Sequence, residues 1–255
     1  MAKHRRRGIY LLPNLFTTAA LFSGFYAVVA AIDSNYGPAA MAIFVAMILD
    51  GMDGRIARMT NTQTDFGVQY DSLSDMASFG FAPALVIYHW SLFGWGKVGW
   101  LAAFIYAAAT ALRLARFNTQ ASVADKRFFQ GLPSPAAAAL IAGLVWMGDS
   151  YGLLDGTTIL FITFPITVLA GVLMVSNIRY HSFKQFDLKG RVPFVAILIV
   201  VLIFVFIASE PPLVLFLMAF SYALSGPIMT LMILRKHRAS RRPAEATSQE
   251  QDSEA

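Results

Sequence analysis

Residues 50–75 read DGMDGRIARMTNTQTDFGVQYDSLSD, and the interpretation of the whole chain starts from this acidic stretch. Four of its aspartates form two closely spaced pairs, Asp50 with Asp53 and Asp71 with Asp75. Strongly apolar segments flank the stretch on both sides. Carboxylates at the margin of a bilayer are costly unless they are paired, bound to a metal or hydrated. The acidic stretch is therefore a candidate functional site.

The composition is that of a membrane protein. Of the 255 residues, 57% are apolar and only 14% are charged, whereas soluble domains are about a quarter charged. The absence of cysteine excludes disulfides and thiol ligands. The net charge of +5 does not indicate nucleic acid as a partner, because the basic residues are spread along the chain in a pattern typical of membrane topology.

Eight apolar segments predict an all-α, polytopic helix bundle. They are residues 9–32, 39–49, 77–92, 98–115, 135–147, 158–175, 193–209 and 213–234. The second segment reaches bilayer length only if its helix continues past Asp50 to Ala57, and the third only if it begins near Phe66. The acidic stretch is then two helix ends joined by a polar turn at residues 60–63.

The lysines and arginines predict the orientation of these segments. Eight spans place both termini on one side, and if that side is cytoplasmic it holds all 20 lysines and arginines except Lys97. We therefore expect a multi-pass protein of the cell membrane with its acidic stretch at the cytoplasmic face. Residues 1–234 are expected to form one membrane domain. Residues 235–255, which are basic and then polar, are expected to form a disordered cytoplasmic tail.

The spacing of the aspartates indicates a metal site. Asp50 and Asp53 are three residues apart, and Asp71 and Asp75 are four apart, so each pair shares one face of a helix. If the two helices pack side by side, four carboxylates converge and repel one another strongly. One divalent cation, or two that share carboxylates, removes this repulsion. Oxygen ligands without histidine or cysteine favour Mg²⁺ or Mn²⁺ over zinc.

The full pattern, D-x2-D-G-x2-A-R-x8-G-x3-D-x3-D, adds four residues to the aspartates, namely Gly54, Ala57, Arg58 and Gly67. Gly54 has no side chain, so a substrate can approach the helix there. Arg58 can pair with a phosphate or a carboxylate. At all eight positions the pattern resembles the signature of the CDP-alcohol phosphatidyltransferase family.

The resemblance implies a metal-assisted transfer in which a hydroxyl attacks the β-phosphorus of CDP-diacylglycerol and releases cytidine monophosphate. Asp50, Asp53 and Asp71 correspond to metal ligands. Asp75 corresponds to the general base and to a shared ligand of a second ion. The expected cofactor is Mg²⁺ or Mn²⁺, as a pair of ions. The positions expected to contact the CDP-lipid are Asn14, Thr17, Gly54, Ala57, Arg58, Thr64 and Gly67.

Five further stretches resemble the bacterial and archaeal branch of the family that forms phosphatidylserine. They are LPNLFTTAALFSGFYA within residues 11–27, SDMASFGFAPA, LRLARFN, GLPSPAAAA and LMVSNIRYHSFK. The branch implies L-serine as acceptor, membrane lipids as surroundings and a homodimer. A serine carboxylate needs a cationic partner. Arg113 and Arg116 lie three apart at the inner end of the fourth segment, and the arginine fork suits a carboxylate.

Other interpretations remain open from the residues alone. The same chemistry can use glycerol phosphate or inositol phosphate as acceptor. The aspartates can instead form salt bridges with nearby arginines, and Arg113 and Arg116 can be interfacial anchors. Asn14 and Thr17 can simply join membrane helices. A cation-coupled transporter would have carboxylates near the bilayer midplane and inverted repeats, and the sequence has neither.

Overall fold

The computed structural model describes residues 11–60, 62, 64–120, 128–152, 157–181 and 194–253. Several predictions concern residues outside these ranges. They include the turn residue Asn61 and the basic residues of segments 1–10, 121–127 and 182–193, on which much of the predicted orientation depends.

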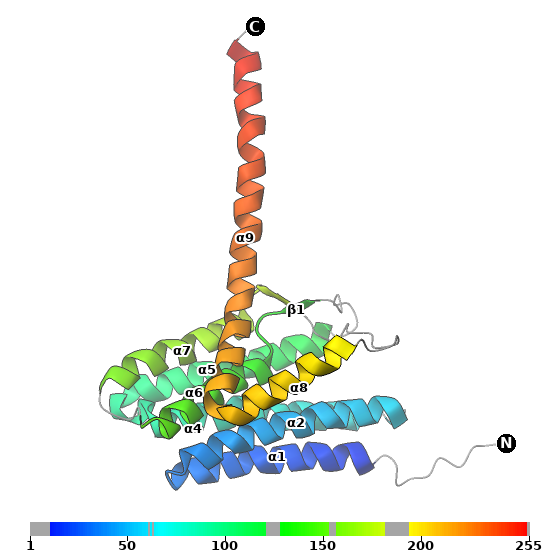
Figure 1. Cartoon of the computed structure of the whole chain (residues 1–255), viewed down its shortest axis with the longest axis vertical. Helices are drawn as coiled ribbons and strands as arrows, with labels where there is room; N and C mark the ends of the chain where they lie inside the picture. Colours follow the sequence, from blue (N-terminus) through cyan, green and yellow to red (C-terminus); the bar gives the residue numbers. More distant parts are fainter. Residues whose placement is uncertain are drawn as a thin grey trace, which may run out of the picture.

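The described chain is almost entirely helical (Figure 1). Its elements are α1 (Leu11–Ile32), α2 (Tyr36–Thr60), α3 (Asp65–Asp75), η2 (Met76–Phe81), α4 (Ala82–Trp90), η3 (Leu92–Trp95), α5 (Lys97–Gln120), β1 (Phe128–Gln130), α6 (Ser134–Ser150), α7 (Thr157–Val175), β2 (Arg179–His181), α8 (Phe194–Ser209) and α9 (Pro211–Ser253). The second helix does continue past Asp50, and the third does begin beside Phe66. That third helix is continuous through α3, the π-helical segment η2 and α4.

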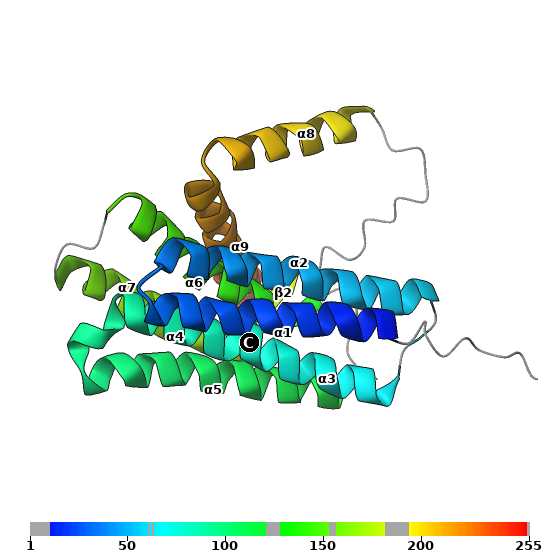
Figure 2. The same cartoon turned by 90° about the horizontal axis from the view of Figure 1, so that it is seen from below.

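Helices α1, α2, α5, α6 and α7 and the third helix run roughly along one direction (Figures 1 and 2). Small side chains let the backbones of α1 and α2 approach closely, among them the buried Ala27, Ala31 and Ala39. The Ser23 hydroxyl adds a hydrogen bond to the Ala42 carbonyl oxygen, at 2.8 Å. The α1–α2 hairpin is thus a rigid support for the acidic end of α2.

Two serine hydroxyls fix the third helix against α1. Ser74 donates to the Thr17 carbonyl oxygen and Ser78 to that of Ala20, each at 3.1 Å. Ser74 and Ser78 lie one turn apart, on either side of the junction between α3 and the π-helix. These bonds hold the aspartate-bearing turns of α3 beside the end of α2.

A two-stranded ribbon connects the start of α6 to the end of α7. In it, β1 pairs antiparallel with β2, and Phe129 lies opposite Tyr180. Gly131 follows β1 with φ of 77°, and its amide donates to the Ile178 carbonyl oxygen at 2.8 Å. A Cβ at Gly131 would collide with the Met174 carbonyl oxygen. The all-α prediction lacked this ribbon, because three-residue strands are too short to show an alternating pattern.

The all-α membrane fold is confirmed in its main feature. Within the described ranges, three helical segments are long and apolar enough to cross a membrane: Leu12–Ile32, Lys97–Thr119 and Pro211–Met232. The apolar helix α8 stands apart from the bundle (Figure 2), and its described side chains are largely exposed. In a bilayer those side chains would face lipid.

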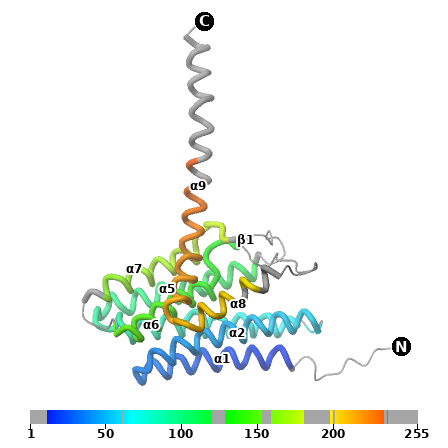
Figure 3. Tube along the Cα trace, in the orientation of Figure 1, coloured from blue at the N-terminus to red at the C-terminus, as the bar shows by residue number. Residues whose placement is uncertain are grey.

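Helix α9 crosses α6 and stands steeply to α1 and α2 (Figures 1 and 3). It continues as one helix to Ser253. Within the predicted tail, residues 235–253 are thus helical, while the division of the chain into a membrane domain and a disordered tail stays a prediction. Elongating an existing helix needs no new nucleus, and the tail is rich in alanine, arginine and glutamate, which favour helix.

Candidate active site

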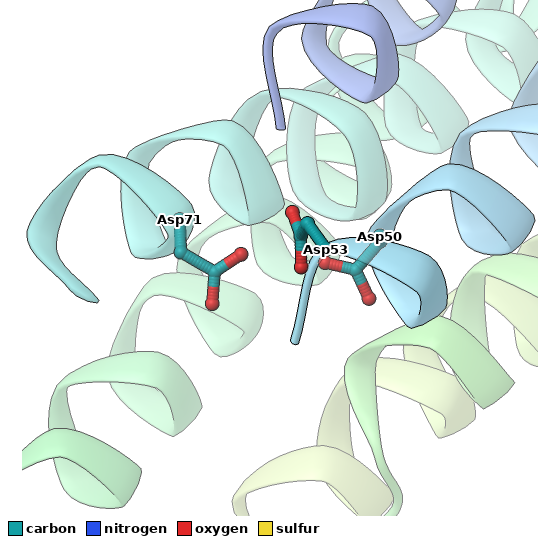
Figure 4. Close-up of side chains that lie close together, drawn as sticks. All are labelled: Asp50, Asp53 and Asp71. Carbon is teal, nitrogen blue, oxygen red and sulfur yellow. The ribbon is translucent and has the colours of Figure 1, made fainter. Parts of the chain in front are cut away.

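Three carboxylates meet between the end of α2 and α3, two helices that both pack against α1. Asp50 and Asp53 on α2 and Asp71 on α3 each offer an oxygen, and these oxygens lie within 4.8 Å of one another. Asp71 points across toward the pair from α2 (Figure 4). Asp53 is only 5% exposed, and the other two are half-buried. The structure thus brings together three of the four aspartates as predicted.

Asp75 lies one turn after Asp71, just outside this set of three. Its carboxyl group is within hydrogen-bonding reach of Asp50 and interacts electrostatically with Arg113. Asp75 therefore lies within electrostatic reach of both the carboxylate cluster of Asp50, Asp53 and Asp71 and a cation on α5. This position differs from that of the other three aspartates and is consistent with a separate role.

The carboxylate cluster fits a hard divalent cation. The Oδ1 atoms of Asp71 and Asp75 are buried without a hydrogen-bond partner among the described residues. Asp71 also lies close to the like charges of Asp53 and Asp50, which repel it. A cation bound by these all-oxygen ligands would remove both penalties.

The alternative of an arginine-paired network is disfavoured at the cluster. The side-chain hydrogen-bond donor to Asp53 is the buried hydroxyl of Thr17, 2.7 Å from Oδ2, and the Gly54 backbone also donates to this carboxylate. Pairing with arginine would also have given partners to the buried oxygens of Asp71 and Asp75. Thr17 was predicted to contact the CDP-lipid. In the structure its hydroxyl lies 2.7 Å from Asp53 Oδ2 and 3.2 Å from the Pro13 carbonyl oxygen, and the shorter contact orients Asp53.

Three further predicted residues meet at the start of α3. Thr64 is the N-cap of this helix, and its hydroxyl accepts a hydrogen bond from the Gly67 amide at 3.0 Å. A Cβ at Gly67 would lie 3.1 Å from Thr64 Oγ1 and 3.5 Å from Asn14 Oδ1. Asn14, Thr64 and Gly67 therefore form one polar corner between α1 and α3.

The remaining predicted residues lie on the last turns of α2. A Cβ at Gly54 would meet nothing within 4 Å, so the helix is open there. Ala57 is half-buried, and Arg58 is exposed near the end of the helix. The open face at Gly54 leaves room for a ligand group beside Asp53.

The two arginines of α5 differ in their surroundings. Arg113 donates through Nη1 to the buried Ser134 hydroxyl at 2.6 Å, while its buried Nε has no hydrogen-bond partner among the described residues. Arg116 donates through Nη1 to the carbonyl oxygen of Val175, the last residue of α7, at 2.9 Å. Both arginines thus have a structural partner, and Arg113 also lies within electrostatic reach of Asp75.

The partner of Arg113 was not predicted. Ser134 begins α6 directly after Leu132 and Pro133, inside the stretch GLPSPAAAA. A serine between two prolines is typical of the start of a helix. The spacing of Ser134 gives no sign of a contact with Arg113, which lies 21 residues earlier. Only the packing of α6 against α5 brings the two side chains together.

Comparison with known proteins agrees with this geometry. Residues 10–176 match the family model described as CDP-alcohol phosphatidyltransferase. The chain belongs to the CDP-alcohol phosphatidyltransferase family. The family resemblance predicted from the eight-position pattern is confirmed, and the matched region covers the carboxylate cluster, Arg113 and Ser134.

Three curated relatives share the name CDP-diacylglycerol–serine O-phosphatidyltransferase. A Helicobacter pylori protein is 39% identical over 198 residues, which cover 77% of this chain and 83% of that protein. A Bacillus subtilis protein is 31% identical over 174 residues, 68% of this chain and 92% of its own. A Methanocaldococcus jannaschii protein is 36% identical over 143 residues, 56% of this chain and 63% of its own.

Proposed function

We propose that this CDP-alcohol phosphatidyltransferase transfers the phosphatidyl group of CDP-diacylglycerol to L-serine, giving phosphatidylserine and cytidine monophosphate. The observation that carries the proposal is the carboxylate cluster of Asp50, Asp53 and Asp71 at the end of α2, with Asp75 beside it. It occurs in a chain whose bacterial and archaeal relatives are named for this reaction.

The reaction needs one proton acceptor and one leaving group. The serine Oγ forms a bond to the β-phosphorus of the lipid nucleotide, and the bond from that phosphorus to the bridging oxygen breaks. The bridging oxygen leaves with cytidine monophosphate. Asp75 takes the hydroxyl proton, because it lies beside the cluster but outside the set of three carboxylates.

Asp50, Asp53 and Asp71 would hold Mg²⁺ or Mn²⁺, with Asp75 shared by a second ion. When bound, such ions supply neutralising charge to the pyrophosphate and the leaving oxygen. Thr17 keeps the Asp53 carboxylate in the orientation for binding through its 2.7 Å hydrogen bond. The role of the protein here is to hold the oxygens close together before any ligand arrives.

The CDP-lipid would lie along the open face of α2 and the polar corner at the start of α3. Gly54 leaves room for it, and Arg58 offers a charge to its phosphates. The predicted contacts also include Ala57, Thr64 and Gly67, with Asn14 and Thr17 from α1. Of these, Asn14 is the side chain nearest to Gly67 after Thr64.

Arg113 is the better candidate of the two arginines for the serine carboxylate, since Arg116 already binds the end of α7. We expect Arg113→Lys to raise the KM for serine about 10- to 100-fold, because a charge-assisted, forked contact is lost. The KM for CDP-diacylglycerol should change much less. Initial rates measured at varied concentrations of each substrate separate the two effects.

Arg116→Lys is the matched control for that experiment. It makes the same substitution three residues later on the same helix, at a side chain bound to the Val175 carbonyl oxygen. We expect it to lower the melting temperature slightly and to leave the KM for serine near that of the parent. An equal rise in the KM for serine in both variants would contradict the assignment of serine binding to Arg113 rather than to Arg116.

We also propose the predicted topology: eight spans, both termini in the cytoplasm, and the active site at the cytoplasmic face of the cell membrane. The support is the charge pattern of the sequence, in which only Lys97 falls on the outer side. Residues 1–234 would form the membrane domain, with 235–255 as its cytoplasmic extension. A homodimer is expected from the family resemblance alone, and its mass can be measured in detergent by light scattering.

The topology can be tested with single cysteines, because the chain has none. Met59→Cys and Ser150→Cys lie at exposed positions near the two ends of the bundle. An impermeant maleimide added to intact cells should label Ser150→Cys only, and Met59→Cys only after permeabilisation. Labelling of Met59→Cys in intact cells would invert the orientation.

The function itself is tested with the purified protein, radiolabelled CDP-diacylglycerol, Mg²⁺ or Mn²⁺, and a panel of acceptors. Phosphatidylserine should be the main product, and its formation should stop when the divalent ions are chelated. If glycerol phosphate or inositol phosphate outcompetes serine, the family chemistry stands and the assignment of the acceptor fails.

A further inference from the structure

The third helix changes its hydrogen-bond pattern directly after Asp75. Residues Met76–Phe81 form a π-helical turn, at the end of which the Ala82 amide bonds to the Ala77 carbonyl oxygen, five residues back. An α-helix bonds four residues back, so the π-turn holds one residue more than an α-helical turn. Turns of this kind are frequent at functional sites. This one separates α3, which carries Asp71 and Asp75, from the buried helix α4.

A proline and a tyrosine account for the hydrogen bonds of this π-turn. Pro83, in the first turn of α4, has no N–H. In an α-helix the Phe79 carbonyl oxygen would accept a hydrogen bond from residue 83, so that bond cannot form here. The hydroxyl of Tyr106 on α5 donates to this oxygen instead, at 3.0 Å, and both side chains are fully buried. Pro83 thus removes the α-helical partner of the Phe79 carbonyl, and Tyr106 replaces it from another helix.

The π-turn is also packed tightly against its two neighbouring helices. A Cβ at Gly24 of α1 would lie 2.7 Å from the Cα of Ser78, whose hydroxyl bonds to α1. A Cβ at Gly80 would lie 3.2 Å from Cγ2 of Thr110 on α5. The backbone of the π-turn is therefore held by both α1 and α5.

The π-turn decides where the aspartates of α3 point. Helix α4 is largely buried, whereas α3 buries only Ser74, so α3 is the half that would move. If the π-turn closed to an α-helix, α3 would rotate by about 100° relative to α4. Asp71 would then no longer point toward Asp50 and Asp53 as it does in Figure 4. Asp75, on the last turn of α3, would rotate with it.

We infer that the π-turn directs Asp71 and Asp75 into the active site, and that Tyr106 is a positioning residue for phosphatidyl transfer because it maintains this turn together with Pro83. The inference rests on the proposed function, since it takes the two aspartates as metal ligand and base. The Tyr106 hydroxyl is engaged by the Phe79 carbonyl oxygen, so its effect reaches the aspartates through the main chain of the third helix.

The first test is Pro83→Ala in the full-length protein. Alanine gives residue 83 an N–H that can donate to the Phe79 carbonyl oxygen, which allows the turn to close to an α-helix. Alanine also favours helix more than proline does, so the melting temperature should stay at the parent value or rise. The kcat should nevertheless fall about 10- to 100-fold, because a small misplacement of catalytic groups is costly. Release of cytidine monophosphate from CDP-diacylglycerol, at saturating serine and Mg²⁺, measures it.

The second test separates positioning from stability. Tyr106→Phe leaves the buried Phe79 carbonyl oxygen without its donor, so both the melting temperature and kcat should fall. Adding Pro83→Ala supplies a main-chain donor to the same oxygen. In the double variant the melting temperature should return toward the parent value, while kcat stays low. A purely structural role of Tyr106 predicts instead that both recover together.

Two controls make the same substitutions elsewhere. Pro165→Ala removes a proline from the interior of α7. Tyr36→Phe removes a tyrosine hydroxyl that donates to the His89 carbonyl oxygen at 3.1 Å, near the end of α4 that is remote from Asp75. Each control should leave kcat at the parent value, whatever its effect on the melting temperature.

A kcat of Pro83→Ala within about twofold of the parent overturns the inference, even if Tyr106→Phe does not fold. Recovery of kcat together with the melting temperature in the double variant also overturns it. If the parent releases cytidine monophosphate with another acceptor but not with serine, the proposed acceptor fails. The same comparison of variants, made with that acceptor, then still decides the inference.

Discussion

Replacing Asp53 by asparagine is expected to lower phosphatidyl transfer by about 10³-fold or more, since the charge stabilisation supplied by a bound ion is worth several kcal/mol. Asp53 is the most buried of the three clustered carboxylates, and an asparagine oxygen can still accept the hydrogen bond from Thr17. The fold should therefore survive while one negative charge leaves the ion site. Turnover of CDP-diacylglycerol with serine, measured over a range of Mg²⁺ and Mn²⁺ concentrations, checks this.

The control for Asp53→Asn is Asp65→Asn. Asp65 is the exposed first residue of α3, off the regular spacing of the other aspartates and outside the cluster. Its loss should leave turnover near that of the parent. Any residual activity of Asp53→Asn should need more metal for half-saturation. Parent activity that persists after exhaustive chelation of divalent ions would overturn the metal assignment for the whole site.

The carboxylate cluster was predictable because helix geometry acts over short distances. The spacing of Asp50 and Asp53 places both on one face of α2 whatever surrounds the helix. The extension of α2 past Asp50 to Ala57 followed from the length that a bilayer requires, and in the structure the helix runs on to Thr60. Pairing α2 with α3 needed only a short turn between them. The family pattern covers these same residues, so local geometry and resemblance led to one site.

The surroundings of the cluster were less predictable, because they depend on contacts between distant segments. The sequence offers no reason to assign Arg113 and Arg116 different roles. In the structure, Arg113 binds Ser134 and Arg116 binds the end of α7. No periodicity relates α5 to α6 or to α7. The roles of two residues three positions apart were therefore separated only by packing.

The same limit explains the ribbon and α9. Tyr180 lies on a strand of three residues, and its partner Gly226 lies in a helix whose apolar pattern indicates only a membrane span. The absence of a side chain at Gly226 matters only because the Tyr180 ring occupies that space. A glycine in an apolar helix has many possible uses, so sequence alone could not assign this one.

Replacing Asp75 by asparagine is expected to lower turnover roughly 10²- to 10⁴-fold, the usual cost of removing a positioned base. Asparagine has nearly the same volume, so the turn between α3 and the π-helix should persist, together with the hydrogen bonds of Ser74 and Ser78 to α1. The three clustered carboxylates stay in place. The serine hydroxyl would then have no side-chain acceptor for its proton beside the cluster.

The dependence on metal separates this defect from that of Asp53→Asn. Asp75 lies outside the set of three clustered oxygens, and an asparagine oxygen can still serve the second ion, so in Asp75→Asn the metal concentration for half-maximal rate should rise less than in Asp53→Asn while the maximal rate falls. In Asp53→Asn that concentration should rise. Near-normal turnover of Asp75→Asn at neutral pH would exclude Asp75 as the base. A fall in rate that excess metal restores would show instead that Asp75 acts mainly as a ligand, and the proton would then have to leave by another route.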